Sequence, residues 1–438
     1  MASHGVSIRC GIAASLLATA TAWMAIAAGR TVRAAPQMTW ASAPLVVGSG
    51  LWPADPSVPP PGPPSVVEPA VRVGISVESI QTTITADDGV QVWLRGEPDT
   101  ALRRVCLPRA TFEPAPGAGV RLVETGDEAV KALIAPSIPS ELLVADGHTY
   151  RGLVEVRPAA RTTLTVVNVV NMEEYVRGVV PNELSSGALT PIEALKAQAV
   201  AARTYALAHL GEYSSKGFDL CATQSCQVYR GADSEHPLSD RAVAETRGVL
   251  ATWRGRPIRA YYTSACGGHT ESGRDVFHDD APYLRGVACV PEGHAQWPIE
   301  SERAAHSHAW EVRLTPAEVR STLDRYGAVG SIRDLVPRRT GISGRVLELE
   351  IVGAEGEMLL TGVKVRRGLG LPESLFVISR ETTLDGAVER FVITGFGRGH
   401  GVGLCQLGAT AMARSGASFA AILKHYYTGI TLTAGSLS

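Results

Sequence analysis

The sequence predicts an α+β protein in which β-rich subdomains surround a helical core. Apolar residues alternate in short segments of 71–165, such as 71–77, which is typical of half-buried strands, and further strand-like segments return at 342–394. Helix-start signals begin at Thr190 and Thr315. Strands and helices do not alternate regularly along the chain, and this irregular order indicates the α+β class. The 438 residues allow two to four domains at roughly 100–200 residues each.

The first half of the chain is expected to pass from strands into one long helix. Thr190 is a suitable N-cap, Pro191 suits the first helical position, and Glu193 completes a capping box. This helix is predicted to run to about Leu210, where Gly211 can close it. The strands expected before it are 71–77, 90–95, 121–124 and 162–170.

The second half is expected to return to strands and to end in two helices. Thr315 and Glu318 repeat the helix-start signal, so a helix is predicted from there to about Tyr326. The remaining predicted elements are strands at 346–351, 376–378 and 391–394 and helices at 404–414 and 418–428.

Residues 1–27 have the layout of a secretory signal peptide. Arg9 precedes an uncharged stretch, and Ala25-Ile26-Ala27 supplies a cleavage site. An uncleaved membrane anchor is the alternative, but Arg30 and Arg33 follow the stretch, and this charge distribution disfavours an anchor with its C-terminal side outside. The protein is therefore expected to be exported to the periplasm or cell wall.

The domain organisation follows from these patterns. Residues 28–70 are predicted to be a proline-rich linker, since eight prolines lie between 53 and 69 and favour an extended spacer. An N-terminal β-rich subdomain is expected at 71–165, and a second domain at 166–435. Within the second domain, about 300–395 is predicted to be an insert-like subdomain.

Composition and charge exclude two classes of protein. Apolar residues make up 45% and charged residues 19%, which is ordinary globular usage and excludes wholesale disorder. Nucleic-acid-binding domains are usually strongly basic, whereas the net charge of this chain is −2, so no nucleic-acid partner is expected.

Glu183 is the first candidate for catalysis. It lies in the apolar run Val179-Val-Pro-Asn-Glu-Leu184, where removal from water would raise the pKa of its carboxyl group. A general acid that works at neutral pH needs such a raised pKa. The residues alone leave open that Glu183 is a solvated or helix-capping carboxylate.

Cys221 and Cys226 lie five residues apart in a polar segment. Outside the cytoplasm, such a pair most often forms a disulfide. A zinc site would need further ligands from elsewhere in the chain, for which His269 and His400 are candidates. Two free thiols are the third alternative.

Residues 261–270 form an apolar strand that ends in a glycine turn. The turn presents Ser264, Cys266 and His269. A Cys–His nucleophile is one interpretation, but no spacing signature supports it, and a turn with a structural cysteine is favoured.

Residues 395–404 contain alternating glycines with Arg398 and His400 between them. No G-x-G-x-x-G register can be placed here, which excludes a dinucleotide-binding loop. Alternating glycines let the backbone approach closely, so the segment is interpreted as a site loop, with a tight structural crossing as the alternative.

Six segments in order resemble the SpoIID/LytB family, named for sporulation stage II protein D and an amidase enhancer. The resemblance covers about 71–432 and implies a SpoIID-like fold around a helical catalytic core. The segments are NMEEYVRGVVPNEL (171–184), PIEALKAQAVAARTY (191–205), CQVYRG (226–231), YYTSACGGHT (261–270), GRGHGVGLCQLGA (397–409) and ILKHYYTG (422–429).

The resemblance implies an enzyme of the cell wall. Sporulation members of the family are lytic transglycosylases that act on peptidoglycan glycan strands stripped of stem peptides, and Glu183 matches the catalytic acid of the family. The bond between MurNAc and GlcNAc would be cleaved with a 1,6-anhydro product. The candidates for holding the glycan are Arg203, Gln227, Tyr229, Ser264, Arg398 and His400.

The resemblance also bears on metal binding. The family's Cys-Gln-Val-Tyr segment is linked to metal in some members, which implies Zn²⁺ at Cys221 and Cys226, with a disulfide equally open. Thr263 stands where the family often has His, which weakens the metal interpretation. Leu184 and Cys405 replace the common Met and Ser.

A non-catalytic role is the alternative function. LytB-like members enhance an amidase, so the protein could bind cell-wall glycan or an N-acetylmuramoyl-L-alanine amidase without cleaving anything itself. A zinc-dependent amidase is a weaker interpretation, because the sequence contains no H-E-x-x-H or comparable ligand cluster.

Overall fold

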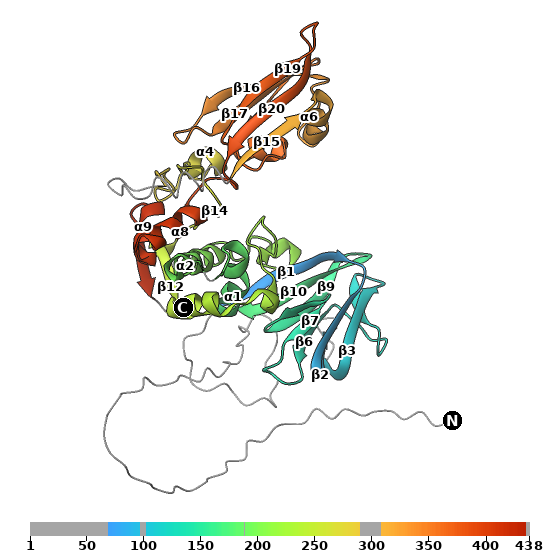
Figure 1. Ribbon diagram of the computed structural model, residues 1–438. Helices are drawn as coiled ribbons and strands as arrows, with labels where there is room; N and C mark the ends of the chain where they lie inside the picture. The colour runs from blue at the N-terminus through green and yellow to red at the C-terminus, as the bar shows by residue number, and fades with distance from the viewer. Residues whose placement is uncertain (1–68, 97–101, 188, 290–307, 435–438) are drawn as a thin grey trace, which may run out of the picture. The chain divides into compact units, whose positions relative to one another are not determined.

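The structure is a computed structural model that describes residues 69–96, 102–187, 189–289 and 308–434 (Figure 1). The expected signal peptide and nearly all of the expected linker lie outside these residues. Within them, no helix combines the length and the apolar character needed to cross a membrane. The described chain contains both helices and many strands, which confirms the predicted α+β class.

The described residues fall into two compact units, the first of which holds 75–170. Its strands join one sheet in the order β1-β10-β9-β6-β2-β3-β4-β5, and β7 pairs with both β2 and β8. Alternation in β2 buries Val90, Val92 and Leu94, as expected for a sheet with one face in a core. The strands are β1 (Ala70–Ser79), β2 (Thr82–Arg95), β3 (Arg103–Ala115), β4 (Gly119–Leu122), β5 (Glu128–Ala129), β6 (Lys131–Pro136), β7 (Leu143–Ala145), β8 (His148–Tyr150), β9 (Leu153–Ala160) and β10 (Thr163–Asn171).

Helix α2 (Ile192–Ala208) is the centre of the second unit, which holds 69–74 and 171–434 among the described residues. Nearly every residue from Ala194 to Ala206 is buried, and many of them are alanines. Because alanine side chains are short, other helices approach α2 closely (Figure 1). These are α1 (Met172–Glu183), α3 (Pro237–Glu245), α8 (Gln406–Arg414) and α9 (Phe419–Tyr426).

Short strand pairs connect distant segments of the second unit. β14 (Tyr262–Thr263) runs parallel to β21 (Leu404–Cys405), which brings two of the family-like segments side by side. A separate sheet has the order β13-β12-β22. The remaining elements of this part are β11 (Leu220–Cys221), β12 (Val249–Trp253), β13 (Arg256–Pro257), β22 (Thr431–Ala434), α4 (Gly273–Phe277) and the 3₁₀ turns η1 (Ser214–Lys216) and η2 (Gly231–Ser234).

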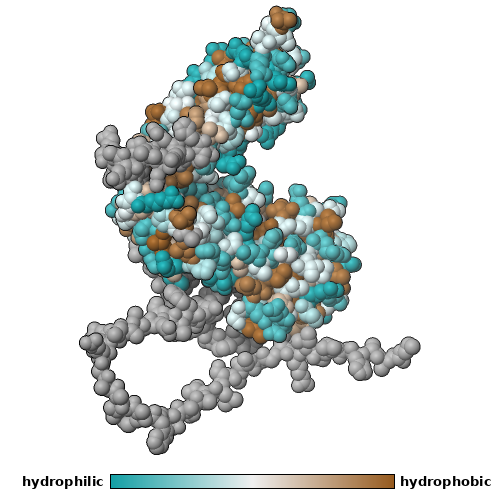
Figure 2. All heavy atoms as spheres, in the orientation of Figure 1, coloured by the Kyte–Doolittle hydropathy of each residue, from teal (hydrophilic) through white to brown (hydrophobic). Residues whose placement is uncertain are grey.

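Residues 309–396 form two three-stranded antiparallel sheets, β15-β20-β19 and β16-β17-β18, around one hydrophobic core. Leu349, Ile351, Phe391 and Ile393 lie in that core. On the face drawn in Figure 2, hydrophobic residues lie in small separate groups among hydrophilic ones. The elements are β15 (Ala309–Leu314), α6 (Pro316–Leu323), β16 (Ile332–Thr340), β17 (Val346–Gly353), β18 (Glu357–Thr361), α7 (Val363–Gly368), β19 (Phe376–Thr382) and β20 (Val388–Phe396).

One of the two predicted capping boxes is confirmed and the other is wrong. At α6, the Thr315 hydroxyl accepts from the Glu318 N–H while the Glu318 carboxylate accepts from the Thr315 N–H. At α2, Pro191 is the N-cap and no side chain caps the helix. Glu193 instead accepts from Lys196 one turn along the helix and from the N–H of Phe419 on α9, and these two partners replace the capping box.

Helix α1 was not predicted, because Gly178 and Pro181 both disfavour helix interiors. Asn171 caps its start by accepting from the Glu174 N–H. Tyr175, Val176, Val179 and Val180 bury one face, and this packing outweighs the poor local propensity.

Candidate active site

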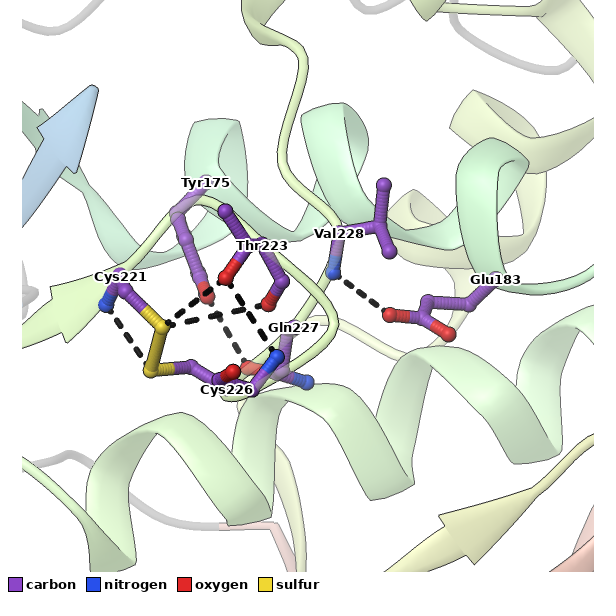
Figure 3. The surroundings of a disulfide bond; sticks show 8 residues. Tyr175, Glu183, Cys221, Thr223, Cys226, Gln227 and Val228 are labelled. Atoms are coloured by element: carbon purple, nitrogen blue, oxygen red, sulfur yellow. Dashed lines mark hydrogen bonds between the residues drawn. A yellow bond between two sulfur atoms is a disulfide. The ribbon is translucent and has the colours of Figure 1, made fainter. Parts of the chain in front are cut away.

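Glu183 is the last residue of α1 and is partly buried. The N–H of Val228 donates to its Oε1 at 2.6 Å (Figure 3). The Tyr262 hydroxyl and the Gln406 amide also donate to its carboxyl group. Three segments that lie far apart in the sequence therefore converge on this one carboxylate.

Opposing effects set the pKa of Glu183. Removal of the carboxyl group from water has the largest effect and raises the pKa, while the hydrogen bonds from Val228, Tyr262 and Gln406 lower it. The net result is a pKa above the ordinary value for glutamate. None of these groups is charged, so the raised pKa does not depend on a second carboxylate.

A chain of hydrogen bonds orients the Tyr262 hydroxyl. The Tyr175 hydroxyl donates to the Gln227 side-chain oxygen at 3.0 Å (Figure 3). The Gln227 side-chain nitrogen in turn donates to the Tyr262 oxygen at 2.9 Å. Burial raises the pKa of Tyr262 well above its ordinary value, so its hydroxyl stays protonated. Because the Tyr262 oxygen already accepts from Gln227, its proton can be directed at Glu183.

Two of the residues expected to hold glycan therefore lie in the interior beside this chain. Gln227 is fully buried and bonds to protein groups, including the Ala202 carbonyl at 3.3 Å. Tyr229 is 5% exposed, and its ring stacks on that of Tyr175 with centroids 5.1 Å apart. Both positions orient or support the site rather than offering a surface to substrate.

Gln406 connects Glu183 with the central helix. It is the first residue of α8, is nearly fully buried, and its side-chain nitrogen also lies 3.3 Å from the side-chain oxygen of Gln198 on α2. Tyr262 lies on β14, and β21 immediately precedes Gln406, so the β14–β21 pair positions two of the donors to Glu183. The sequence reasoning missed both donors, although each lies within a family-like segment.

His400 bonds to the backbone that carries Tyr262. The Val402 N–H donates to Nδ1 at 3.1 Å, so the other ring nitrogen carries the proton and donates to the Tyr262 carbonyl. Burial, together with the nearby Arg366 and Arg345, lowers the pKa of His400 to about 3. The imidazole is therefore neutral and positions Tyr262, whereas the sequence predicted that it would hold substrate.

Gly403 supports this loop through its backbone. Its φ is +74°, and a Cβ there would lie 2.0 Å from the Tyr261 carbonyl oxygen. Gly403→Ala is expected to lower the free energy of unfolding by about 1–3 kcal/mol beyond Gly416→Ala, because overlap with a fixed backbone adds to the backbone strain. Gly416 is the matched control, since its φ is +91° but nothing lies within 4 Å of a Cβ there. Equal losses in chemical denaturation would contradict this account.

Arg203 lies in the interior of the second unit, with no exposed surface. Its Nε and one terminal nitrogen donate to the two carboxylate oxygens of Glu173 at 2.7 and 2.6 Å. The Gly248 N–H also donates to Glu173, at 3.1 Å. Arg203 therefore ties α2 to α1 and, in this structure, has no surface with which to contact a glycan as the sequence had predicted.

Ser264 and Arg398 are the two expected glycan-holding residues that are exposed. Their segments lie side by side, since Ala265 and Arg398 exchange backbone hydrogen bonds of 3.0 and 2.9 Å. Among the predicted set, these are the side chains that solvent can reach most freely.

Arg345 lies in the insert formed by residues 309–396 and holds the loop that bears Ser264. Its side chain is completely buried. Its terminal nitrogens donate to the carbonyl oxygens of Cys266 and His269, both at 2.7 Å. One of these nitrogens also lies 3.3 Å from the Glu373 carboxylate. The charge of Arg345 is thus balanced inside the protein while its donors hold the loop.

Cys221 and Cys226 are joined by a disulfide (Figure 3). Bonded sulfurs are not thiolates and cannot serve as zinc ligands. The two histidines considered as further ligands are engaged elsewhere, His400 as described and His269 with the Thr270 carbonyl at 2.6 Å. The predicted zinc set does not fit this site, and the disulfide alternative is the one that the structure contains.

Comparison with known proteins places these features in a family. The family described as Stage II sporulation protein (SpoIID) matches residues 160–253, and a domain of unknown function (DUF8618) matches 299–403. An uncharacterized protein of Brachyspira hyodysenteriae is 36% identical over 275 residues, which cover 62% of this chain and 68% of that protein.

Two named relatives come from Bacillus subtilis. Its stage II sporulation protein D is 30% identical over 291 residues, which cover 63% of this chain and 78% of that protein. Its amidase enhancer is 27% identical over 295 residues, but these cover 40% of that longer protein. The chain belongs to the SpoIID/LytB family, and its function is related to the cell wall.

Proposed function

We propose that this protein is a peptidoglycan lytic transglycosylase in which Glu183 acts first as acid and then as base. The observation that carries the proposal is a partly buried carboxyl group with a raised pKa and three uncharged donors. Most glycosidases need two carboxylates beside the scissile bond. A lytic transglycosylase needs one, because the C6 hydroxyl of the substrate's own muramic acid is the nucleophile.

The proposed reaction balances without water. Protonated Glu183 gives its proton to the oxygen that links MurNAc C1 to GlcNAc, and the C1–O bond breaks. The resulting carboxylate accepts the proton of the C6 hydroxyl as that oxygen bonds to C1 and closes the 1,6-anhydro ring. Glu183 is then protonated again, and one glycan strand has become two.

The three donors suit this double role. A protonated acid is favoured by burial, while the carboxylate that remains after proton transfer accepts hydrogen bonds from Val228, Tyr262 and Gln406. Preorganised donors stabilise such a developing charge without having to reorient. Exposed Ser264 and Arg398 are the residues proposed to contact the glycan.

The products decide between this proposal and its rivals. The protein is incubated with peptide-stripped glycan strands and with intact peptidoglycan, and the new ends are identified by mass spectrometry. Anhydromuramic ends are the expected result on stripped strands. New reducing ends that contain added water would contradict the proposal.

The activity is expected to fall as pH rises through the pKa of Glu183, because the first step needs the protonated acid. Tyr262→Phe removes a donor that favours the carboxylate, so the pKa of Glu183 rises further and the alkaline limb of the profile moves to higher pH. Tyr261→Phe is the control, since Tyr261 does not contribute to the pKa of Glu183. A downward shift in Tyr262→Phe, or equal shifts in both variants, would contradict this assignment.

An amidase-enhancing role is the second candidate function, and the likeness to the amidase enhancer of Bacillus subtilis favours it. In that case the protein would leave both substrates intact. It would instead accelerate stem-peptide release when an N-acetylmuramoyl-L-alanine amidase is added. The same incubation with and without an amidase separates the two functions.

The proposed function requires an exported protein, in the periplasm or cell wall. The signal-like layout of 1–27 supports export, as does the Cys221–Cys226 disulfide, since disulfides persist in oxidising compartments. Cell fractionation and the mass of the mature chain test this part. Recovery of the uncleaved chain from the cytoplasm alone would contradict it.

A further inference from the structure

Cys266, Cys289 and Cys405 converge in the interior of the second unit. Their Sγ atoms all lie within 4.8 Å of one another, and the residues are 1%, 6% and 1% exposed. Among the described residues, this is the one group of three potential metal ligands brought so close together. It is distinct from the Cys221–Cys226 pair, whose sulfurs are bonded to each other.

The cluster is held by backbone contacts from several segments. β14 and β21 pair Thr263 with Cys405, and the Cys289 N–H donates to the Gly268 carbonyl at 2.9 Å. Three short stretches of chain therefore present one sulfur each to a common point. An arrangement fixed by backbone hydrogen bonds is preorganised for a ligand that takes all three.

The surroundings of the sulfurs suit thiolates. Cys405 is the N-cap of α8, and its Sγ accepts from the N–H groups of Gly408 at 3.4 Å and Cys266 at 3.3 Å. The Tyr426 hydroxyl lies 3.2 Å from the Cys289 Sγ. N–H groups that point at a thiolate are the usual outer partners of cysteine metal ligands.

We propose that Cys266, Cys289 and Cys405 bind one thiophilic metal ion, Zn²⁺ or Cu(I). Soft thiolates select these ions. A Zn–S distance of about 2.3 Å puts tetrahedral ligand sulfurs roughly 3.8 Å apart, so the cluster needs to contract by no more than about 1 Å. Each thiol loses its proton on binding, and the metal then holds all three sulfurs together.

The number of sulfurs separates this proposal from a disulfide. A disulfide joins only two sulfurs. It would therefore not explain why the fold brings a third buried thiol to the same point. A metal ion uses all three. It would also lock the start of α8, where Gln406 donates to Glu183, to the turn that carries Ser264.

The test starts from the full chain with Cys221→Ser and Cys226→Ser, which removes the two thiols that reduction of the Cys221–Cys226 disulfide would release. The protein is reduced without oxygen, stripped by a chelator, and titrated separately with Zn²⁺ alone and with Cu(I) alone. One equivalent of either ion is expected to bind and to raise the melting temperature. Co²⁺ in place of Zn²⁺ is expected to give the absorption bands of sulfur-to-cobalt charge transfer.

Cys405→Ser and Cys266→Ser in that background are expected to lose these bands and to weaken metal binding at least about tenfold. Circular dichroism confirms that each variant is folded. The Cys221→Ser/Cys226→Ser chain itself gives a readout that does not depend on any substitution in the cluster, because the intensity of its Co²⁺ charge-transfer bands reports the number of thiolate ligands.

Three results would overturn the proposal. One is loss of all metal binding in the Cys221→Ser/Cys226→Ser chain, and another is unchanged binding in Cys405→Ser. The third is a disulfide between two of the three cysteines, found by peptide mapping of the protein as isolated. These readouts do not involve glycan cleavage, so they stand apart from the test of the proposed function.

Discussion

Glu183→Gln is expected to slow glycan cleavage by about 10²–10⁴-fold, because the amide cannot give a proton to the leaving oxygen or take one from the C6 hydroxyl. The glutamine oxygen still accepts from the Val228 N–H, so the local structure is kept. The measurement is the initial rate at which anhydromuramic ends appear from peptide-stripped strands.

Stability gives this variant a second readout. Because the folded-state pKa of Glu183 is raised, its ionised form disfavours folding as pH rises through that pKa. A neutral glutamine removes that cost, so the free energy of unfolding near neutral pH is expected to be equal to or higher than that of the wild type. Loss of activity with unchanged or greater stability is typical of a residue kept for chemistry.

The control for this variant is Glu212→Gln, which makes the same change at an exposed carboxylate in the second unit. It is expected to retain wild-type activity. A Glu183→Gln rate within tenfold of wild type would exclude Glu183 as the acid. An equal loss in both variants would show that the change in charge, and not the site, is responsible.

Arg203→Met is expected to cost about 3–5 kcal/mol of unfolding free energy, because it leaves Glu173 buried without its partner. Two short hydrogen bonds join these side chains, and neither residue is appreciably exposed. The measurement is chemical denaturation at neutral pH. A glycan-binding role would instead raise KM in the variant and leave its stability unchanged.

The double variant Glu173→Leu/Arg203→Met is the informative control. When both charges of a buried pair are replaced by apolar groups of similar size, the cost is often small. The double variant is therefore expected to be more stable than either single variant, which gives a large coupling energy in a double-mutant cycle. Additive losses would show that the two side chains do not act as a pair.

Local patterns predicted much of the fold. The stretch rich in Val and Thr at 162–170 corresponds to β10, and the Thr315 signal corresponds to the start of α6. These features depend on neighbours in sequence, which is why the sequence reveals them. Helix α1 escaped prediction because its stability comes from tertiary packing that overrides Gly178 and Pro181.

Only those site residues that the local sequence makes conspicuous could be predicted. Glu183 stood out by its apolar surroundings and by the family resemblance. Tyr262 and Gln406 did not stand out, because their role depends on lying beside Glu183 in the folded protein, and the local sequence does not reveal that proximity. Arg203 was misassigned for the same reason, since its partner Glu173 lies on another helix.

The contacts of Arg345 limit how far this protein can be shortened. The insert from 309 to 396 has its own core and sheets, which suggests that it can be deleted without harm to the rest of the fold. Yet its Arg345 supplies the donors for the Cys266 and His269 carbonyls. Excision would leave those carbonyls unmatched beneath the loop that bears Ser264, so the smallest working fragment of this chain must retain the insert.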